Sequence, residues 1–191
     1  MSETPSTMLE IGFQAPAFSL PEPATGKTVS LANYEGRPLL VVFACNHCPY
    51  VLHIIDSFTE FANQALQRDL GVVMISANDA TGYPADSPEN MAALAERQGF
   101  EFPYLYDESQ QVALAYRAAC TPDFFLFDSS HRLVYRGQYD PSRPGSQAPV
   151  DGRDLKAAVD AVLGGGEVSV EQIPSVGCNI KWRAGNEPDY F

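Results

Sequence analysis

The sequence predicts one α/β domain with a central mixed sheet and helices on both of its faces. Two continuous apolar runs, 39–44 and 70–77, are typical of strands buried on both faces of a sheet. Apolar residues between them recur at helical spacing, which indicates two parallel strands joined by a helix. Further along, DFFLFD and RLVYRGQY are separated only by 129–131, which favours an antiparallel hairpin over a crossover.

The elements of the N-terminal half follow in order. A Pro- and Gly-rich opening predicts a hairpin, with strands at 18–20 and 28–31 around a turn at 24–26. After the first buried strand, a helix begins at Pro49, a residue that suits the first helical turn, and continues to Arg68. The second buried strand follows, and the polar segment NDATGYPADSPEN after it indicates a loop.

The C-terminal half begins with a clearly bounded helix. Ser87 is the expected N-cap, Pro88 occupies the first helical position, and Gly99 ends the helix. A short strand, an acidic turn and a helix through 113–117 come next. The β-hairpin follows, and a final helix in GRDLKAAVDAVLGGG stops at three glycines.

Length and composition predict a single domain with an appended tail. The chain has 191 residues, of which 45% are hydrophobic and 19% charged, as in globular proteins. The segment 167–191 shows no clear period. We therefore expect a domain over 1–166 and a C-terminal extension over 167–191 that packs on it.

Charge and hydropathy exclude several classes of partner. The formal charge of −12 disfavours nucleic acid, whose phosphates would repel the chain, and predicts a solvated acidic surface. No apolar run approaches the ~20 residues that span a bilayer, so no membrane partner is expected. The opening MSETPSTMLEIG lacks the basic and apolar regions of a secretion signal, and a cytoplasmic location is the expectation.

Four cysteines carry the functional signal: Cys45, Cys48, Cys120 and Cys178. The first two form a C-x-x-C motif where the buried strand gives way to the helix. Unpaired N–H groups and the helix dipole stabilise a thiolate at a helix N-terminus, and a thiol two residues away can resolve a mixed disulfide. His47, when protonated, adds a positive group. A zinc site usually needs four ligands, and no second short-spaced pair occurs, so neither a metal nor another cofactor is expected.

Several motifs together resemble a known family. The strand–CNHCP–helix order, CTPDFFLFD and LVYRG resemble the thioredoxin fold, and IGFQAPAFSL…GKTVSLANYEGRPLLVVF resembles the opening of peroxiredoxin-like (AhpC/TSA-type) proteins. The resemblance covers roughly 11–163. It implies a thioredoxin-like fold and a cis bond at Thr121-Pro122, opposite the active cysteine. It also implies that a substrate peptide pairs with the backbone just before that proline.

The resemblance leaves open which cysteine attacks. In a thioredoxin-like register, Cys45 attacks and Cys48 resolves. In a peroxiredoxin-like register, Cys48-Pro49 is the peroxidatic position and Cys45 replaces a threonine that orients peroxide. Counted from Phe43, Cys48 also falls where thioredoxins carry their first cysteine, so that Cys45 resolves from the other side.

The peroxidatic arginine is missing from its expected position near Pro122, and Arg117 belongs to a predicted helix. Dithiol–disulfide exchange is therefore the favoured function, on protein or small-molecule disulfides with a reductant of the thioredoxin or glutathione type. The alternatives are a thiol-dependent peroxidase that uses Cys48, and a non-enzymatic redox-sensing or metal-binding module. Cys120 and Cys178 are candidates for additional redox thiols, and a buried, inert role is the alternative for each.

Overall fold

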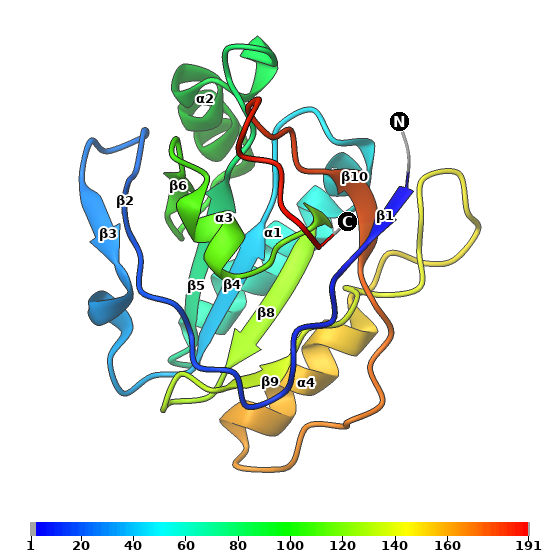
Figure 1. Ribbon diagram of the computed structural model, residues 1–191. Coiled ribbons are helices and arrows are strands. Elements are labelled where there is room, and N and C mark those ends of the chain that lie inside the picture. Colours follow the sequence, from blue (N-terminus) through cyan, green and yellow to red (C-terminus); the bar gives the residue numbers. More distant parts are fainter. Residues whose placement is uncertain (1–2, 191) are drawn as a thin grey trace.

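The computed structural model describes residues 3–190 and is built on a five-stranded sheet of order β6-β5-β4-β8-β9 (Figure 1). Its strands are β4 (Leu39–Phe43), β5 (Gly71–Ser76), β6 (Tyr104–Tyr106), β8 (Asp123–Phe127) and β9 (Leu133–Tyr135). Strands β4, β5 and β6 are parallel, whereas β8 and β9 run antiparallel to their neighbours. The predicted mixed sheet with parallel strands at its centre is confirmed.

Helices cover both faces of this sheet. They are α1 (Pro49–Leu66), α2 (Pro88–Gln98), α3 (Gln111–Ala115) and α4 (Arg153–Leu163). Because side chains alternate along a strand, Leu40 and Val42 of β4 pack in one core with Phe58 of α1, whereas Val41 packs in a second core with Tyr116 at the end of α3. Each such side chain, when fully buried, contributes roughly 1.5–3 kcal/mol to folding.

The N-terminal hairpin consists of β2 (Ser19–Pro21) and β3 (Thr28–Ser30), paired antiparallel, and a 3₁₀ turn, η1 (Leu31–Tyr34), follows it. The limits of α2 also agree with the sequence: the Ser87 side chain accepts a hydrogen bond from the Asn90 N–H at 3.3 Å, and Gly99 adopts a left-handed φ of 69°. The predicted loop after β5 contains a 3₁₀ turn that sequence patterning did not indicate, η2 (Pro84–Asp86).

A small second sheet, absent from the sequence prediction, joins the two ends of the chain. Its order is β1-β10-β7, formed by β1 (Glu3–Pro5), β10 (Val176–Asn179) and β7 (Cys120–Thr121), all antiparallel. Figure 1 shows the N-terminal and C-terminal segments side by side in this sheet. Strands of two to four residues are too short for an alternation pattern to register.

Within residues 3–190, no helix combines the length and apolar character that a bilayer crossing requires.

Candidate active site

The two cysteines of the C-x-x-C motif lie where β4 ends and α1 begins. Cys48 is the N-cap residue of α1 with φ −69° and ψ 120°, and Pro49 is the first helical residue. The backbone N–H groups of the first helical turn have no carbonyl partner within the helix. They can therefore stabilise an anion at this position. Cys45 precedes it in the connecting loop, and both side chains are almost fully buried, 1% and 0% exposed.

Cys48 is the acidic thiol of the site. A hydrogen bond from the Cys45 thiol lowers the pKa of Cys48 to about 5, and burial opposes this shift. Further hydrogen bonds from Thr121, Cys178 and the backbone of Val51 also lower the pKa of Cys48. Several donors therefore stabilise the thiolate form of Cys48, whereas the thiol form donates to the Thr121 carbonyl at 3.1 Å.

Cys45 has the opposite character. Its hydrogen bond to Cys48, its burial and the nearby Asp86 carboxylate all raise the pKa of Cys45 well above the ordinary value. The two opposite shifts favour a pair of one thiolate and one thiol, with the proton on Cys45. This asymmetry matches a nucleophile and a waiting resolving thiol.

Thr121 and Pro122 lie directly across from this pair. The Thr121–Pro122 bond is cis, as the family resemblance implied. The protonated Cys48 thiol donates a hydrogen bond to the Thr121 carbonyl at 3.1 Å, and the Cys45 sulfur lies 3.6 Å from the Thr121 hydroxyl. One residue thus contacts both sulfurs.

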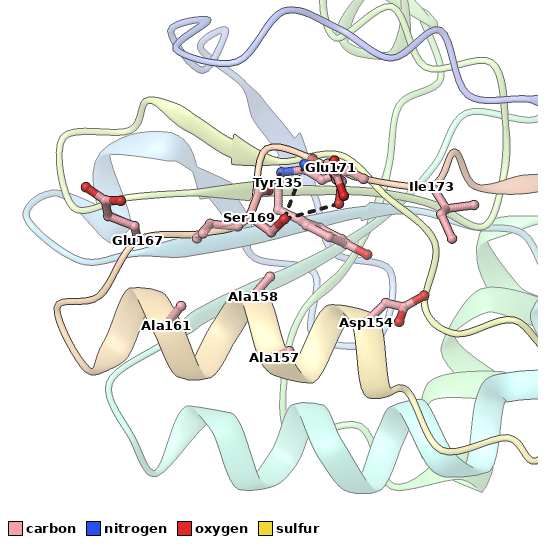
Figure 2. Close-up of a pocket in the computed structure, with 11 residues that line it drawn as sticks. Tyr135, Asp154, Ala157, Ala158, Ala161, Glu167, Ser169, Glu171 and Ile173 are labelled. Carbon is pink, nitrogen blue, oxygen red and sulfur yellow. Dashed lines mark hydrogen bonds between the residues drawn. The ribbon is translucent and has the colours of Figure 1, made fainter.

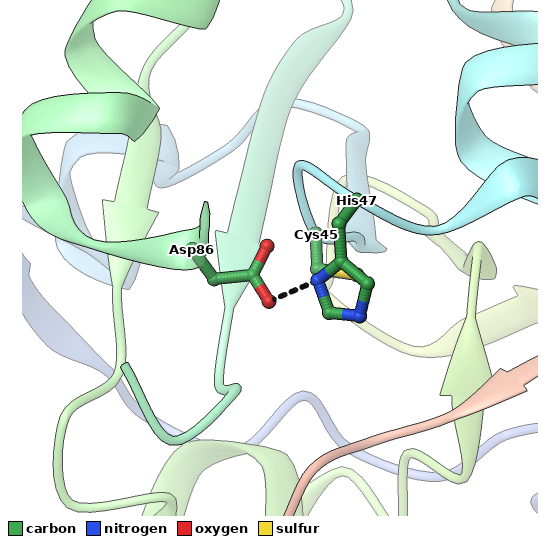
Figure 3. A group of neighbouring side chains, drawn as sticks. All are labelled: Cys45, His47 and Asp86. Carbon is green, nitrogen blue, oxygen red and sulfur yellow. Dashed lines mark ion pairs between the residues drawn. The ribbon is translucent and has the colours of Figure 1, made fainter. Parts of the chain in front are cut away.

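His47 is oriented by a residue that the sequence analysis missed. The Nδ1 atom of His47 lies 2.7 Å from a carboxylate oxygen of Asp86 (Figure 3). The His47 ring also stacks on Tyr83, with centroids 5.6 Å apart. Asp86 belongs to η2, inside the segment predicted as a loop. An acidic residue just before a helix cap was the only local signal, and such residues are common without a functional role.

The Asp86 carboxylate is fully buried and organises the loop between the cysteines. It accepts hydrogen bonds from the Asn46 backbone N–H at 2.7 Å and from the Asn78 side chain at 2.8 Å. Cys45, His47 and Asp86 present potential metal-ligand atoms that all lie within 4.8 Å of one another. Both carboxylate oxygens already receive N–H donors from the two asparagines, and Asp86 also pairs with His47 by charge when the imidazole is protonated.

The other two cysteines lie on neighbouring strands of the small sheet. Cys178 in β10 pairs with Thr121 of β7, and its thiol is hydrogen-bonded to the Cys48 sulfur. Burial and this contact raise the pKa of Cys178 to about 12. Cys120 instead donates to the carbonyl of Pro122 at 3.6 Å and lies 4.0 Å from that of Ser175, and burial raises its pKa.

Strand β10 encloses the thiols. In the described part of the chain none of the four cysteines forms a disulfide, and each is at most 2% exposed. A crevice of about 20 Å³ beside Tyr50, Pro122 and Val176 has room for little more than a water molecule, and no cysteine lines it. A larger hollow of about 370 Å³ lies between α4 and the segment 167–173, and no cysteine lines it (Figure 2).

Comparisons with known proteins agree with this fold. Residues 11–136 match the AhpC/TSA family. An uncharacterized conserved protein from Geobacillus kaustophilus is 47% identical and superposes with a TM-score of 0.94, covering 96% of this chain and 97% of that one. A hypothetical protein from Sinorhizobium meliloti is 48% identical, with a TM-score of 0.93 and coverage of 95% and 100%. Peroxiredoxin Bcp of Escherichia coli is 28% identical over 129 residues, 66% of this chain and 78% of that protein.

The chain therefore belongs to the AhpC/TSA family. Within it, the chain is a peroxiredoxin-like oxidoreductase of thioredoxin fold that acts through thiols.

The acidity of Cys48 makes a testable prediction about pH. The ultraviolet thiolate absorbance that Cys48→Ser removes is expected to titrate near pH 5 in the folded protein, instead of near 9. Because the folded-state pKa is depressed, Cys48 stabilises the fold fully above its unfolded pKa, and this contribution is lost as pH falls through about 5. Urea denaturation of the wild type and of Cys48→Ser, at pH values between about 9 and 5, measures this loss of stability. A Cys48 absorbance that titrates near 9 would contradict the assignment.

Proposed function

We propose that the protein is a thiol–disulfide oxidoreductase in which Cys48 is the nucleophile and Cys45 the resolving thiol. One observation supports this choice above the others: Cys48 caps α1 and accepts a hydrogen bond from Cys45, so that Cys48 holds the negative charge and Cys45 the proton. Among the registers left open by the sequence, this favours the one in which Cys45 resolves from the N-terminal side.

The reaction proceeds in two exchanges. The Cys48 thiolate attacks one sulfur of a substrate disulfide, a new disulfide forms, and the other substrate sulfur leaves as a thiolate that takes up a proton. Cys45 then loses its proton and attacks the Cys48 sulfur, which forms the Cys45–Cys48 disulfide and releases the second substrate thiol. Two electrons pass from the protein to the substrate.

The local charges support the order of these exchanges. The Cys48 thiolate keeps Cys45 protonated, and covalent bond formation removes that negative charge, so the pKa of Cys45 falls only after the first exchange. His47 has a ring nitrogen within 4.8 Å of the Cys45 sulfur and is the base proposed to accept its proton.

The partners follow from the chemistry. The substrate is a protein or small-molecule disulfide, and a reductant of the thioredoxin or glutathione type restores the dithiol. A cytoplasmic location, where thiols stay reduced, is part of the proposal. So is the division into a catalytic domain over 1–166 and an extension over 167–191 that covers the site.

A second candidate is a thiol peroxidase with Cys48 as the peroxidatic cysteine. The burial of the thiols favours it, because each cysteine is at most 2% exposed and hydrogen peroxide is much smaller than a protein disulfide. The position of Arg117 argues against a peroxidase, which carries an arginine beside its thiolate. The Arg117 guanidinium instead stacks on Tyr190, 4.8 Å from the ring centroid. Peroxide reduction is therefore proposed as the slower activity.

The test compares two classes of oxidant, disulfides and hydrogen peroxide, under one reductant. With dithiothreitol as electron donor, we expect faster turnover of oxidised glutathione and insulin disulfides than of hydrogen peroxide, and peptide mapping of the oxidised protein is expected to show a Cys45–Cys48 disulfide. Full activity in both Cys45→Ser and Cys48→Ser would refute the dithiol mechanism. Faster consumption of peroxide than of either disulfide would establish the second candidate instead.

A further inference from the structure

We propose that Cys178 is a second resolving thiol, which competes with Cys45 for the sulfur of Cys48. This inference rests on the proposed function and deepens it, because it assigns a redox role to the C-terminal extension. The site then contains three exchanging thiols with Cys48 at the centre.

The strand pairing brings Cys178 to the site. Cys178 lies opposite Thr121 in the antiparallel β10–β7 pair, and residues directly opposite each other share one face of a sheet. Thr121 is the residue that contacts both motif cysteines, with the Cys48 sulfur 3.1 Å from its carbonyl oxygen. The thiols of Cys178 and Cys48 are in hydrogen-bonding contact.

The sequence next to Cys178 makes this close pairing possible. A Cβ atom at Gly177 would lie 2.0 Å from the Thr121 carbonyl oxygen and 2.7 Å from its carbonyl carbon, far inside contact distance. Only glycine allows β10 to approach the backbone of Thr121 so closely. β1 holds the other edge of β10, where Glu3 pairs with Cys178.

Cys120 provides the contrast. It neighbours Thr121 in the chain, so its side chain points to the opposite face of β7. Its sulfur contacts the carbonyls of Pro122 and Ser175. Cys120 is as buried as Cys178 and belongs to the same small sheet, and it is therefore the matched control for a thiol that does not exchange.

The exchange is balanced without any further reagent. After Cys48 has formed a mixed disulfide with a substrate thiol, Cys178 loses its proton and attacks the Cys48 sulfur. The Cys48–Cys178 bond forms, the bond to the substrate breaks, and the substrate leaves as a thiolate that is protonated. Loss of the Cys48 negative charge lowers the pKa of Cys178 at this stage, because that charge is one of the causes of its elevation.

The experiment uses oxidised glutathione as the oxidant on the full-length reduced protein, followed by thiol blocking and non-reducing peptide mapping. In Cys45→Ser we expect a Cys48–Cys178 disulfide as the main product. In the double variant Cys45→Ser/Cys178→Ser, the mixed disulfide of Cys48 with glutathione is expected to last at least about ten times longer. In Cys45→Ser/Cys120→Ser the map should match that of Cys45→Ser.

The outcomes separate the two proposals. If the wild type forms Cys45–Cys48 and reduces glutathione, but neither it nor Cys45→Ser yields a Cys48–Cys178 peptide, the role of Cys178 is refuted and the dithiol mechanism stands. If wild-type Cys48 forms no mixed or internal disulfide, the proposed function itself fails. In the peptide map of the oxidised wild type, we expect a Cys48–Cys178 disulfide as well as the Cys45–Cys48 disulfide. This result does not depend on any substitution.

Discussion

Replacing Cys48 by serine is expected to lower the rate of disulfide reduction by about 10³-fold or more, because a hydroxyl at this position does not ionise near neutral pH. The donors that lower the pKa of Cys48 stabilise a thiolate, and they leave a serine protonated. The measurement is the single-turnover rate at which the reduced protein converts oxidised glutathione to glutathione.

Two other cysteine variants calibrate this result. Cys120→Ser is expected to retain the wild-type rate, because the Cys120 sulfur contacts carbonyl groups on the opposite face of β7. Cys45→Ser should lose only about tenfold, since Cys178 is available to resolve the mixed disulfide. A rate for Cys48→Ser within tenfold of the wild type, or a larger loss in Cys45→Ser than in Cys48→Ser, would assign the nucleophile to Cys45.

Asp86→Ala is expected to lower the free energy of unfolding by about 3–5 kcal/mol, because the substitution leaves buried donors without their acceptor. Asp86 is fully buried, and its carboxylate receives N–H groups of Asn46 and Asn78 and lies 2.7 Å from the His47 ring nitrogen. Equilibrium denaturation in urea at neutral pH measures the loss.

Asp86→Asn is the matched control, since it keeps one acceptor oxygen and removes the charge. We expect it to cost less stability than Asp86→Ala. It should also lower the pKa of Cys45, because the Asp86 carboxylate is one of the groups that raise it. Thiolate titration reports this second effect. If Asp86→Ala unfolds at the same urea concentration as the wild type, Asp86 does not organise the site.

The elements with a strong local pattern agreed between sequence and structure. The apolar runs gave β4 and β5, the helical spacing gave α1, and the Ser-Pro start and glycine end gave α2. These features depend on neighbouring residues, so a single sequence contains their whole signal. The position of Cys48 at the start of α1 belongs to the same group, because it follows from the change of period at that point.

The features that escaped prediction depend on residues far apart in the chain. Asp86 is separated from Asn46 by 40 positions, yet its hydrogen bond fixes the loop between the cysteines. Strand β10 has four residues, one of which is glycine, and only its pairing with β1 and β7 makes it a strand. Neither feature has a periodicity or a spacing that a sequence pattern can detect.

The sequence alone thus determined the fold class, the C-x-x-C motif at a strand-to-helix junction, and the family to which the motifs point. The tertiary structure decided the chemistry within the motif. It lowered the pKa of Cys48, paired His47 with Asp86, and brought Cys178 opposite Thr121, the residue that contacts both motif cysteines. The physical reason is that a thiol's pKa and reach depend on burial and on donors from distant segments, which only the packed chain brings together.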